Sequence, residues 1–508
     1  MTTSSSTEAS STETSGLRKG RLGIAGIVFF VVAASAPLVG MTGAIPVAIA
    51  AGNGAAAPGA YLMVGIVLLI FSVGYATMSN KMTNAGAFFA YVGRGLGRNM
   101  GIASAFASIL GYAAIQLAIY GFFGGLLTTQ MAGLGINLPW YVWTLIAWVV
   151  VTALSLMSVD IGAKVLGVLL ILELTSLLVT AIVMLVNGGP EGINIGASFA
   201  PSNIFVGGFT GGAGIAIAFA FASFIGFEAT AIYGEESKDP KRSVPRATYL
   251  AIGVITVLFA IVSFAMVTGM GSSQVVQQVL DRSTVDGVAL TDPAAVLFSL
   301  ADHYVGSWMS TVMSWLVISS LFAGLLAFQN ATARYFFALG RGGILPSSFG
   351  RTNAKGAPRN GVLLTSLIAV IVILYFAIAR LDPVLNMFFW MSAVTAIAII
   401  FVEVLVSAAV ISFFRKEGGA NLWQGTIAPA IAIVALVVGE YLLMSRFNLL
   451  AGVAPAGVDP SLPGSAWQLS VLGWFLVLSP FIAAIIGYVV AMLRKQNETA
   501  EITEDILS

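Results

Sequence analysis

Long apolar segments alternate with short polar loops along almost the whole chain. A segment of about 20 apolar residues can cross the hydrocarbon core of a bilayer, which is about 30 Å thick. The predicted spans are residues 22–52, 59–79, 99–129, 140–158, 162–187, 211–235, 246–270, 307–339, 362–379, 384–414, 422–446 and 467–493. The pattern therefore predicts an all-α integral membrane protein with 12 transmembrane helices.

The basic residues of the predicted loops favour one orientation of these helices. With the N-terminus in the cytoplasm, 20 of the 23 Lys and Arg residues fall on the cytoplasmic side, and the exceptions are Arg282, Arg380 and Arg446. Cytoplasmic loops normally carry such an excess of basic residues, and a miscounted span would scramble it. The distribution supports the number of spans and predicts a multi-pass protein of the plasma membrane with both termini cytoplasmic.

Composition agrees with a lipid environment and argues against several classes of protein. Hydrophobic residues make up 58% of the 508 residues and charged residues only 9%, against about 25% charged residues in soluble domains. The net charge of +1 excludes a strong nucleic-acid footprint. The chain contains no cysteine and one histidine, His303, so thiolate metal sites are excluded and His-based catalysis nearly so. We expect no enzymatic activity and no cofactor, and we interpret His303 as a solvated loop residue.

The first predicted span contains an interruption in the stretch SAPLVGMTGAIP, residues 35–46. The residues that disturb a helix there are Pro37, Gly40, Gly43 and Pro46. Proline removes a helical donor, while glycine permits non-helical torsions and lets a ligand approach the backbone. Because backbone groups freed in lipid are costly, the break should face the protein interior or a water-filled cavity. Either the break binds a ligand, or it is a proline kink that only shapes packing.

A second interruption is predicted in the sixth span, where residues 211–236 read GGAGIAIAFAFASFIGFEATAIYGEE. Ser223, Gly226 and Glu228 lie near its middle. If helices 1–5 and 6–10 are inverted repeats, the first and sixth spans occupy equivalent positions. Interrupted segments at matching positions of two halves point to the midplane binding site of a transporter.

Helix dipoles at the two breaks suggest the kind of ligand. In the first span, the outer half-helix would begin near Gly40–Gly43 and turn free N–H groups towards the midplane, which suits a carboxylate. In the sixth span, the outer half would end near Phe221–Ser223 and present carbonyl oxygens, which suit an ammonium group. A molecule that carries both groups on one carbon is an α-amino acid.

Three further segments carry a family likeness. They are NAGAFFAYVGRGLG at residues 84–97, FIGFEATAIYGEESKDPKRSVPRA at 224–247 and NATARYFFALGRGGILP at 330–346. Together they resemble the amino acid–polyamine–organocation (APC) superfamily, close to its bacterial amino acid permeases. The resemblance implies a leucine-transporter (LeuT) type fold with 5+5 inverted repeats, broken helices 1 and 6, and binding of the substrate main chain at the two unwound segments.

The resemblance also divides the chain into parts. Residues 18–415 would form the ten-helix inverted-repeat transporter core, and residues 416–495 would form transmembrane helices 11 and 12. Residues 1–17, which are mostly Ser and Thr, are typical of a disordered cytoplasmic tail. Residues 496–508 are expected to form a cytoplasmic C-terminal tail.

The candidate substrate contacts come from both breaks and from the third span. They are Gly40, Met41, Thr42, Gly43, Gln116, Phe221, Ala222, Ser223, Phe224 and Gly226. The family's usual first-span pattern is Gly-Ser-Gly or a relative, and here the two glycines are separated by one additional residue. Gln116 shares a helix face with Tyr112 and Tyr120, and this face either lines the pocket or makes interhelical hydrogen bonds. At least one of Phe221 and Phe224 is a candidate for an aromatic lid.

Four acidic residues lie inside predicted spans, away from the last residue of each span, and charged groups there are functional candidates by default. Glu173 lies near the middle of the fifth span, and Glu228 directly follows the break in the sixth. A carboxyl group in apolar surroundings favours its neutral form, so both are proton-coupling candidates; an acid that fixes helix packing is the alternative for each. The resemblance implies a Lys at the position of Glu173 in several proton-coupled relatives. Glu403 and Glu440 lie near span ends, where we expect structural acids or acids that reach headgroups or water.

Ser319 and Ser320 in the eighth span offer an alternative coupling site. The resemblance implies that sodium-coupled members of this fold bind Na⁺ with paired hydroxyls there and with carbonyls of the first span. Hard cations prefer such oxygen ligands. Small residues that allow close helix packing are the other interpretation, and no other metal site is expected.

These observations predict a secondary active amino acid permease that works by alternating access, with proton-coupled uptake of neutral or apolar amino acids. The expected partners are an amino acid, a coupling proton and the lipid bilayer. A polyamine or amine permease and an amino acid exchanger are the alternatives. A non-transporting sensor or scaffold with a transporter fold is the alternative from a different class.

Overall fold

The computed structural model describes residues 23–82, 87–157, 163–228, 230, 237 and 239–494. The predicted tails, residues 1–17 and 496–508, lie outside these residues. The described part of the chain consists of helices and loops, and it contains no β-strand beyond one isolated bridge between Val285 and Val288. The prediction of an all-α fold is confirmed.

The helices of the first half lie where the hydropathy pattern predicts them. Their bounds are α1 Ile24–Ala34, α2 Pro37–Val39, α3 Ile45–Val47, α4 Ala57–Ser79, α5 Ala87–Leu96, α6 Arg98–Ala132, α7 Trp140–Met157, α8 Ala163–Asn187 and α11 Ala213–Phe224. Two π-helical segments and one 3-10 turn connect α2 to α4, and they are η1 Gly40–Ala44, η2 Ala48–Asn53 and η3 Gly54–Ala56. The loop between α8 and α11 contains α9 Ile195–Phe199, α10 Pro201–Ile204 and η4 Gly208–Thr210.

The second half also follows the predicted spans. Its long helices and the π segments that precede two of them are α13 Pro240–Met270, α16 Ser307–Arg341, α17 Arg359–Ile378, η7 Pro383–Phe388, α18 Phe389–Glu417, η8 Trp423–Ile427, α19 Ala428–Ser445 and α21 Val471–Leu493. Its loops contain the short helices α14 Val275–Ser283, α15 Ala294–Tyr304, η6 Ser347–Gly350, α20 Phe447–Leu450 and η9 Pro463–Ser465.

Ten stretches of the described chain are long and apolar enough to cross a membrane. The first, Ile24–Ser79, takes in two predicted spans and has a non-helical kink at Gly52, where φ is −99° and ψ is −117°. α11 is apolar but has only 12 residues, fewer than the about 20 that a full crossing needs. The chain is therefore a helical multi-pass membrane protein. α11 accounts for the part of the sixth predicted span that precedes its predicted break, and most of the residues from 229 to 235 lie outside those that the structure describes.

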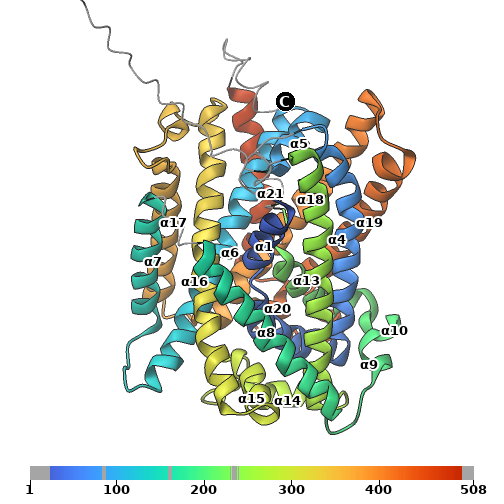
Figure 1. Cartoon of the computed structure of the whole chain (residues 1–508), viewed down its shortest axis with the longest axis vertical. Coiled ribbons are helices and arrows are strands. Elements are labelled where there is room, and N and C mark those ends of the chain that lie inside the picture. The colour runs from blue at the N-terminus through green and yellow to red at the C-terminus, as the bar shows by residue number, and fades with distance from the viewer. Residues whose placement is uncertain are drawn as a thin grey trace, which may run out of the picture.

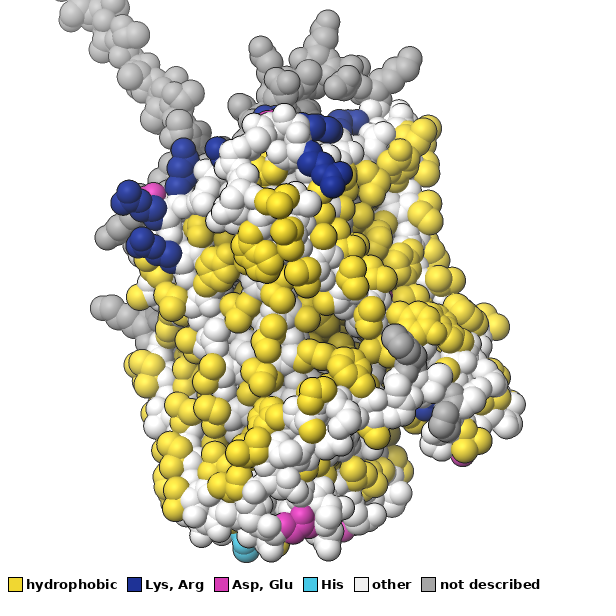
Figure 2. Space-filling model, turned by 90° about the vertical axis from the view of Figure 1, so that its right-hand side faces the viewer, with side chains coloured by type: hydrophobic (Ala, Val, Ile, Leu, Met, Phe, Trp, Pro, Cys, Tyr) yellow, Lys and Arg dark blue, Asp and Glu magenta, His cyan; other side chains and the backbone are white. Residues whose placement is uncertain are grey.

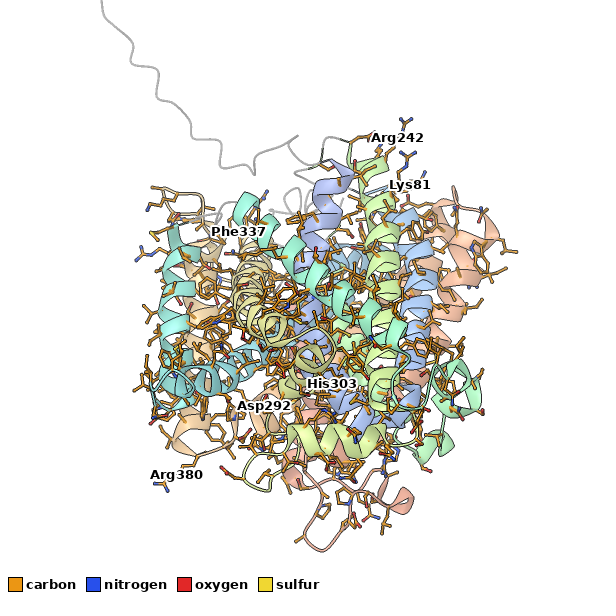
Figure 3. All side chains as sticks on the ribbon, turned by 60° about the horizontal axis from the view of Figure 1, so that its bottom comes forward. Lys81, Arg242, Asp292, His303, Phe337 and Arg380 are labelled. Atoms are coloured by element: carbon orange, nitrogen blue, oxygen red, sulfur yellow. The ribbon has the colours of Figure 1, made fainter. Side chains whose placement is uncertain are left out.

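The long helices run between two ends of the molecule, with α14 and α15 at the lower end and α5 near the upper end (Figure 1). Hydrophobic side chains cover much of the face shown in Figure 2, and Lys and Arg side chains gather mainly at its upper end. Figure 3 shows Lys81 and Arg242 at the upper end and Arg380 at the opposite end. This separation agrees with the predicted placement of these three residues on different sides of the membrane.

The outer faces of the helices carry exposed apolar side chains, as a lipid environment allows. Val471 of α21 is 90% exposed, Val186 of α8 is 81% exposed and Ile378 of α17 is 80% exposed. Inside the molecule, small residues allow helices to approach closely. Gly65 of α4 lies directly against Thr256 of α13, where a larger side chain would overlap the threonine.

Candidate functional site

The first predicted span breaks at Ser35 and Ala36. α1 ends at Ala34, Ala36 adopts a left-handed backbone conformation with φ 42°, and α2 begins at Pro37. The ring of a proline keeps the preceding residue out of the α-helical region, which explains why the break directly precedes Pro37. The expectation that the outer half-helix begins near Gly40–Gly43 is therefore wrong by about one turn.

The segment Gly40–Ala44 is π-helical and its five residues are buried. The Gly40 N–H donates to the Ala36 carbonyl at 3.1 Å, so it is not a free helix-terminal donor. The Thr42 hydroxyl donates to the Leu38 carbonyl of its own helix at 2.7 Å. These predicted substrate contacts line the first turns after the break instead of forming the break itself.

Gly43 packs against two aromatic rings from distant helices. A Cβ added at Gly43 would lie 2.9 Å from the ring of Phe122 and 3.0 Å from the ring of Phe388. These rings stack on each other with centroids 4.8 Å apart. Sequence reasoning missed both phenylalanines because aromatic residues are common in every span and give no local signal.

Glu173 of α8 caps the helical segment that follows the first break. Its Oε1 atom accepts a hydrogen bond from the Leu38 N–H at 2.7 Å, and its side chain is buried. The Ser320 hydroxyl of α16 lies near this carboxyl group. A carboxylate is favourable at the first turn of a helix, where N–H groups lack helical acceptors. The helix end expected to meet a substrate carboxylate thus holds a carboxyl group of the protein.

The second break follows α11. α11 ends at Phe224, Ile225 has an extended backbone with φ −58° and ψ 132°, and Gly226 has φ +116°. A φ in this range is accessible to glycine and strained for other residues. The interruption therefore lies inside the stretch in which the sequence predicts it.

Only some of the carbonyl groups at the end of α11 accept hydrogen bonds from the residues that follow it. The hydrogen bonds that close the helix reach the carbonyls of Ala222 and Phe224, each at 3.3 Å. The carbonyls of Phe221 and Ser223 receive no backbone hydrogen bond from the described residues beyond the end of α11. Open carbonyls at a helix C-terminus carry partial negative charge and suit a cationic group.

The two breaks lie against each other. A Cβ added at Gly226 would lie 3.0 Å from the Cβ of Ala34 and 3.4 Å from the Ser35 nitrogen. A Cβ added at Gly40 would lie 3.4 Å from the Ser223 hydroxyl oxygen. Segments almost 190 residues apart in the sequence are therefore neighbours, and one helix end rich in N–H groups meets another with open carbonyls.

Gly226→Ala is expected to lower the free energy of unfolding by about 1–3 kcal/mol, because alanine is strained at this φ and its methyl group would crowd Ala34. Thermal unfolding of the purified protein in detergent measures the effect. Gly253→Ala is the matched control, because a Cβ at Gly253 has no neighbour within 4 Å. Equal melting temperatures for the two variants would contradict the packing of the breaks.

Glu228 stabilises the second break through hydrogen bonds. Its Oε2 atom accepts from the Gly226 N–H at 2.9 Å, and its Oε1 atom accepts from the Tyr112 hydroxyl of α6 at 2.8 Å. The Tyr75 hydroxyl of α4 donates to the main-chain carbonyl of Glu228 at 3.1 Å. Both carboxyl oxygens thus have donors that fix the backbone, and this favours the packing role for Glu228 over proton coupling.

Gln116 belongs to a chain of hydrogen bonds between helices. Its Nε2 atom donates to Gln329 Oε1 of α16 at 2.5 Å. Gln329 in turn donates to the Val362 carbonyl and to the Ser366 hydroxyl of α17, and Ser366 bonds Thr152 of α7 at 2.9 Å. The interhelical interpretation of Gln116 is therefore favoured. Gln329 is a buried amide in the middle of a span, a signal that sequence reasoning left unused.

The aromatic residues of α11 face different neighbours. Phe224 packs edge-on against Phe259 of α13 with centroids 5.5 Å apart, whereas Phe221 lines a small cavity on another side of α11. Tyr61 of α4, which sequence reasoning missed, hydrogen-bonds the Ser223 hydroxyl at 3.1 Å. Phe221 and Phe224 thus have different neighbours, and the aromatic lid expected from at least one of them stays a prediction.

The paired hydroxyls of the eighth span also have different partners. Ser319 donates to the Leu316 carbonyl of its own helix at 2.7 Å, while Ser320 lies near Glu173. Of the two, Ser320 is thus the one near the carboxyl group that caps the first break.

Glu403 and Glu440 are buried, which contradicts one of the two expected roles, that of acids that reach headgroups or water, and leaves the structural role. Glu403 is 1% exposed and Glu440 is 8% exposed. Glu403 lies in the middle of α18, because this helix continues to Glu417. The snorkelling interpretation is therefore wrong for both acids.

Aromatic contacts fill the space on both sides of the breaks. On the side of Gly43, the stacked rings of Phe122 and Phe388 cover the helix. Beyond Gly226, Phe227 packs edge-on against Phe71 with centroids 6.0 Å apart. The breaks are therefore enclosed in this conformation.

Comparison with known proteins shows the family of this chain. The model of the amino acid permease family matches residues 26–501. The chain belongs to this family. The permease is 26% identical to the branched-chain amino acid permease BcaP of Lactococcus lactis subsp. cremoris, over 77% of this chain and 83% of that protein. It is 23% identical to the branched-chain amino acid permease BcaP of Bacillus subtilis, over 88% of each chain.

The name of a third relative indicates a different substrate from that of the two branched-chain permeases. The permease is 27% identical to the histidine permease HisP of Lactococcus lactis subsp. cremoris, over 62% of this chain and 64% of that protein. The family match confirms the resemblance to the APC superfamily that three sequence segments indicate. Amino acid transport across a membrane is the activity that the family and these relatives support.

Proposed function

We propose that this permease imports neutral or apolar amino acids across the plasma membrane, driven by protons, by alternating access. The observation that carries the proposal is the meeting of the two breaks, where helix ends of opposite polarity face each other. The proposal includes 12 spans in a LeuT-type arrangement, with residues 18–415 as a 5+5 inverted-repeat core. Residues 416–495 would add helices 11 and 12, and both terminal tails would be cytoplasmic.

The main chain of the substrate would bind between the breaks. Its ammonium group would approach the open carbonyls of Phe221 and Ser223. Its carboxylate would approach the first broken helix beside Gly40, which keeps the space next to Ser223 free of a side chain. To accept backbone N–H groups there, it would compete with Glu173 for the Leu38 N–H and with the Ala36 carbonyl for the Gly40 N–H. Hydrogen bonds from backbone N–H groups to a carboxylate are strong, charge-assisted contacts.

The surroundings of Gly40 and Gly43 support an apolar side chain in the substrate. The rings nearest to these two glycines are those of Phe259, Phe122 and Phe388. A polyamine would need an acid with free oxygens beside this space, yet both oxygens of Glu228 already accept hydrogen bonds. Branched-chain substrates, which the names of two relatives indicate, agree with such surroundings.

Glu173 is the proposed proton carrier because of its hydrogen bond to Leu38. A carboxylate caps the helix strongly, and a protonated carboxyl group caps it weakly, so protonation would loosen this end of the broken helix. Transport of the proton and rearrangement of the first span would thus be linked. Sodium binding near Ser320, with Glu173 as the charged ligand, is the second candidate and rests on their proximity.

Uptake into proteoliposomes tests the proposed function. The assay compares the 20 amino acids and putrescine, with an imposed pH gradient and no sodium. Saturable, gradient-driven uptake of apolar amino acids is the expected result. Uptake that requires sodium would move the coupling site to Ser320, and preferential uptake of putrescine would favour the amine permease. Substrate binding without any flux would favour a sensor.

A further inference from the structure

Glu403 of α18 is a buried acid with an unsatisfied oxygen. Its side chain is 1% exposed, and its Oε2 atom has no hydrogen-bond partner among the residues that the structure describes. Leaving a charged carboxylate in apolar surroundings without a partner costs several kcal/mol. The group is therefore either neutral or paired with a ligand.

A small cavity lies beside this acid. Its walls come from α4, α11, the second break and α18, and its lining residues are Leu68, Phe221, Ile225, Phe227, Ala396, Ile399, Ile400 and Glu403. The cavity is about the size of one water molecule. Glu403 supplies the one ionisable side chain among these eight lining residues, so the cavity is a small apolar space with a single carboxyl group in its wall.

Two further buried acids lie near Glu403. They are Glu228, which follows the second break, and Glu440 of α19, whose Oε1 atom also lacks a partner within the described ranges. As acids, they cannot compensate a negative charge on Glu403. The Tyr112 hydroxyl, on a neighbouring helix, is committed to Glu228.

We propose that Glu403 is a second proton-binding site of this permease, separate from Glu173. In the enclosed conformation the carboxyl group holds a proton. Ile225 and Phe227 flank Gly226 and form part of the cavity wall, so a movement of the second break opens the cavity to water. The O–H bond of the carboxyl group then breaks, the proton passes to water as hydronium, and the carboxylate remains. The site thus connects the state of the second break to proton release.

Infrared spectroscopy of the purified full-length protein in lipid nanodiscs tests the site. A protonated carboxyl group gives a C=O stretching band that an ionised one lacks. Glu403→Gln is expected to remove one such band at neutral pH. Glu417→Gln is the matched control on the same helix, because the side chain of Glu417 is 51% exposed and pairs with Arg94 at 3.8 Å; this variant should leave the band unchanged.

Two results would overturn the proposal. One is a Glu403→Gln spectrum that keeps every protonated-carboxyl band of the unmodified protein. The other is loss of the band on addition of sodium at constant pH, which would make the cavity a metal cation site. Should Glu403→Gln fail to fold, Glu403→Asp supplies the test, because an aspartic acid in this place gives a band at a shifted frequency.

Proton release is tested by transferring the protein to D₂O. The carboxyl proton of Glu403 exchanges for deuterium, and this exchange shifts the C=O band. We expect slow exchange of this proton in the enclosed protein. During substrate turnover, we expect the exchange to be at least about tenfold faster. Exchange that is equally fast in both conditions would contradict opening of the cavity with the second break. The C=O band at neutral pH requires no substrate and no pH gradient, so its presence does not depend on the proposed function. If proton-driven uptake failed, the proton site at Glu403 would still be supported by the band. If the band were absent, the uptake test would be unaffected.

Discussion

Replacing Gly40 with leucine is expected to reduce amino acid uptake by about 10- to 100-fold while the protein still folds. A Cβ at this position already touches Phe259 at 3.3 Å and the Ser223 hydroxyl at 3.4 Å. The further carbons of leucine would fill the space between the two breaks, which is where the substrate main chain is proposed to bind. Overpacking of this kind costs about 1–3 kcal/mol, and each 1.4 kcal/mol withheld from substrate binding is about a tenfold loss.

The measurement is uptake into proteoliposomes, with the melting temperature in detergent as the check on folding. Gly253→Leu is the control for glycine replacement, because a Cβ at Gly253 has no neighbour within 4 Å. Gly40→Leu should lose uptake with a modest change in melting temperature, and Gly253→Leu should keep both. Normal uptake by Gly40→Leu would remove the binding site from the space between the breaks.

The positions of the helices could be predicted from the sequence because each span must be apolar over the thickness of the bilayer. Apolar length decides where helices begin and end, so α6 at Arg98–Ala132 and α16 at Ser307–Arg341 lie within a few residues of their predicted bounds. The interruption lies within the predicted stretch 35–46, but the outer half-helix begins at Pro37, about one turn earlier than the expected start near Gly40–Gly43. Pro37 decides the break, since it restricts the residue before it, and the glycines serve close packing.

The contacts between side chains in the candidate site could not be predicted from the sequence. Leu38 and Glu173 are 135 residues apart, and Tyr112 and Glu228 are 116 residues apart. Spacing along one helix predicts which side chains share a face, but it carries no information about which helix that face meets. Sequence reasoning could therefore name Glu173 and Glu228 as buried acids without finding the N–H and hydroxyl groups that distinguish their roles.

Glu173→Gln is expected to uncouple uptake from the pH gradient. The amide oxygen of glutamine can still accept the Leu38 N–H, so the cap on the first broken helix is kept in weaker form. An amide does not exchange a proton in this pH range, so the gradient no longer drives accumulation. The expected loss is about tenfold in steady-state accumulation for each pH unit of gradient, because one unit corresponds to about 1.4 kcal/mol per proton. Uptake of labelled substrate with and without an imposed gradient measures it.

Glu173→Ala separates the capping role from proton coupling. Alanine removes the acceptor and leaves the buried Leu38 N–H unpaired, which costs about 1–3 kcal/mol of stability. If Glu173 both caps the helix and carries the proton, the glutamine variant keeps its melting temperature and loses only the response to pH, while the alanine variant loses both. If Glu173 is a cap alone, glutamine leaves the response to pH intact, and the coupling proton must then bind elsewhere. Because the same carboxyl group holds the end of the broken helix, a coupling role here needs no separate relay between protonation and movement of the first span.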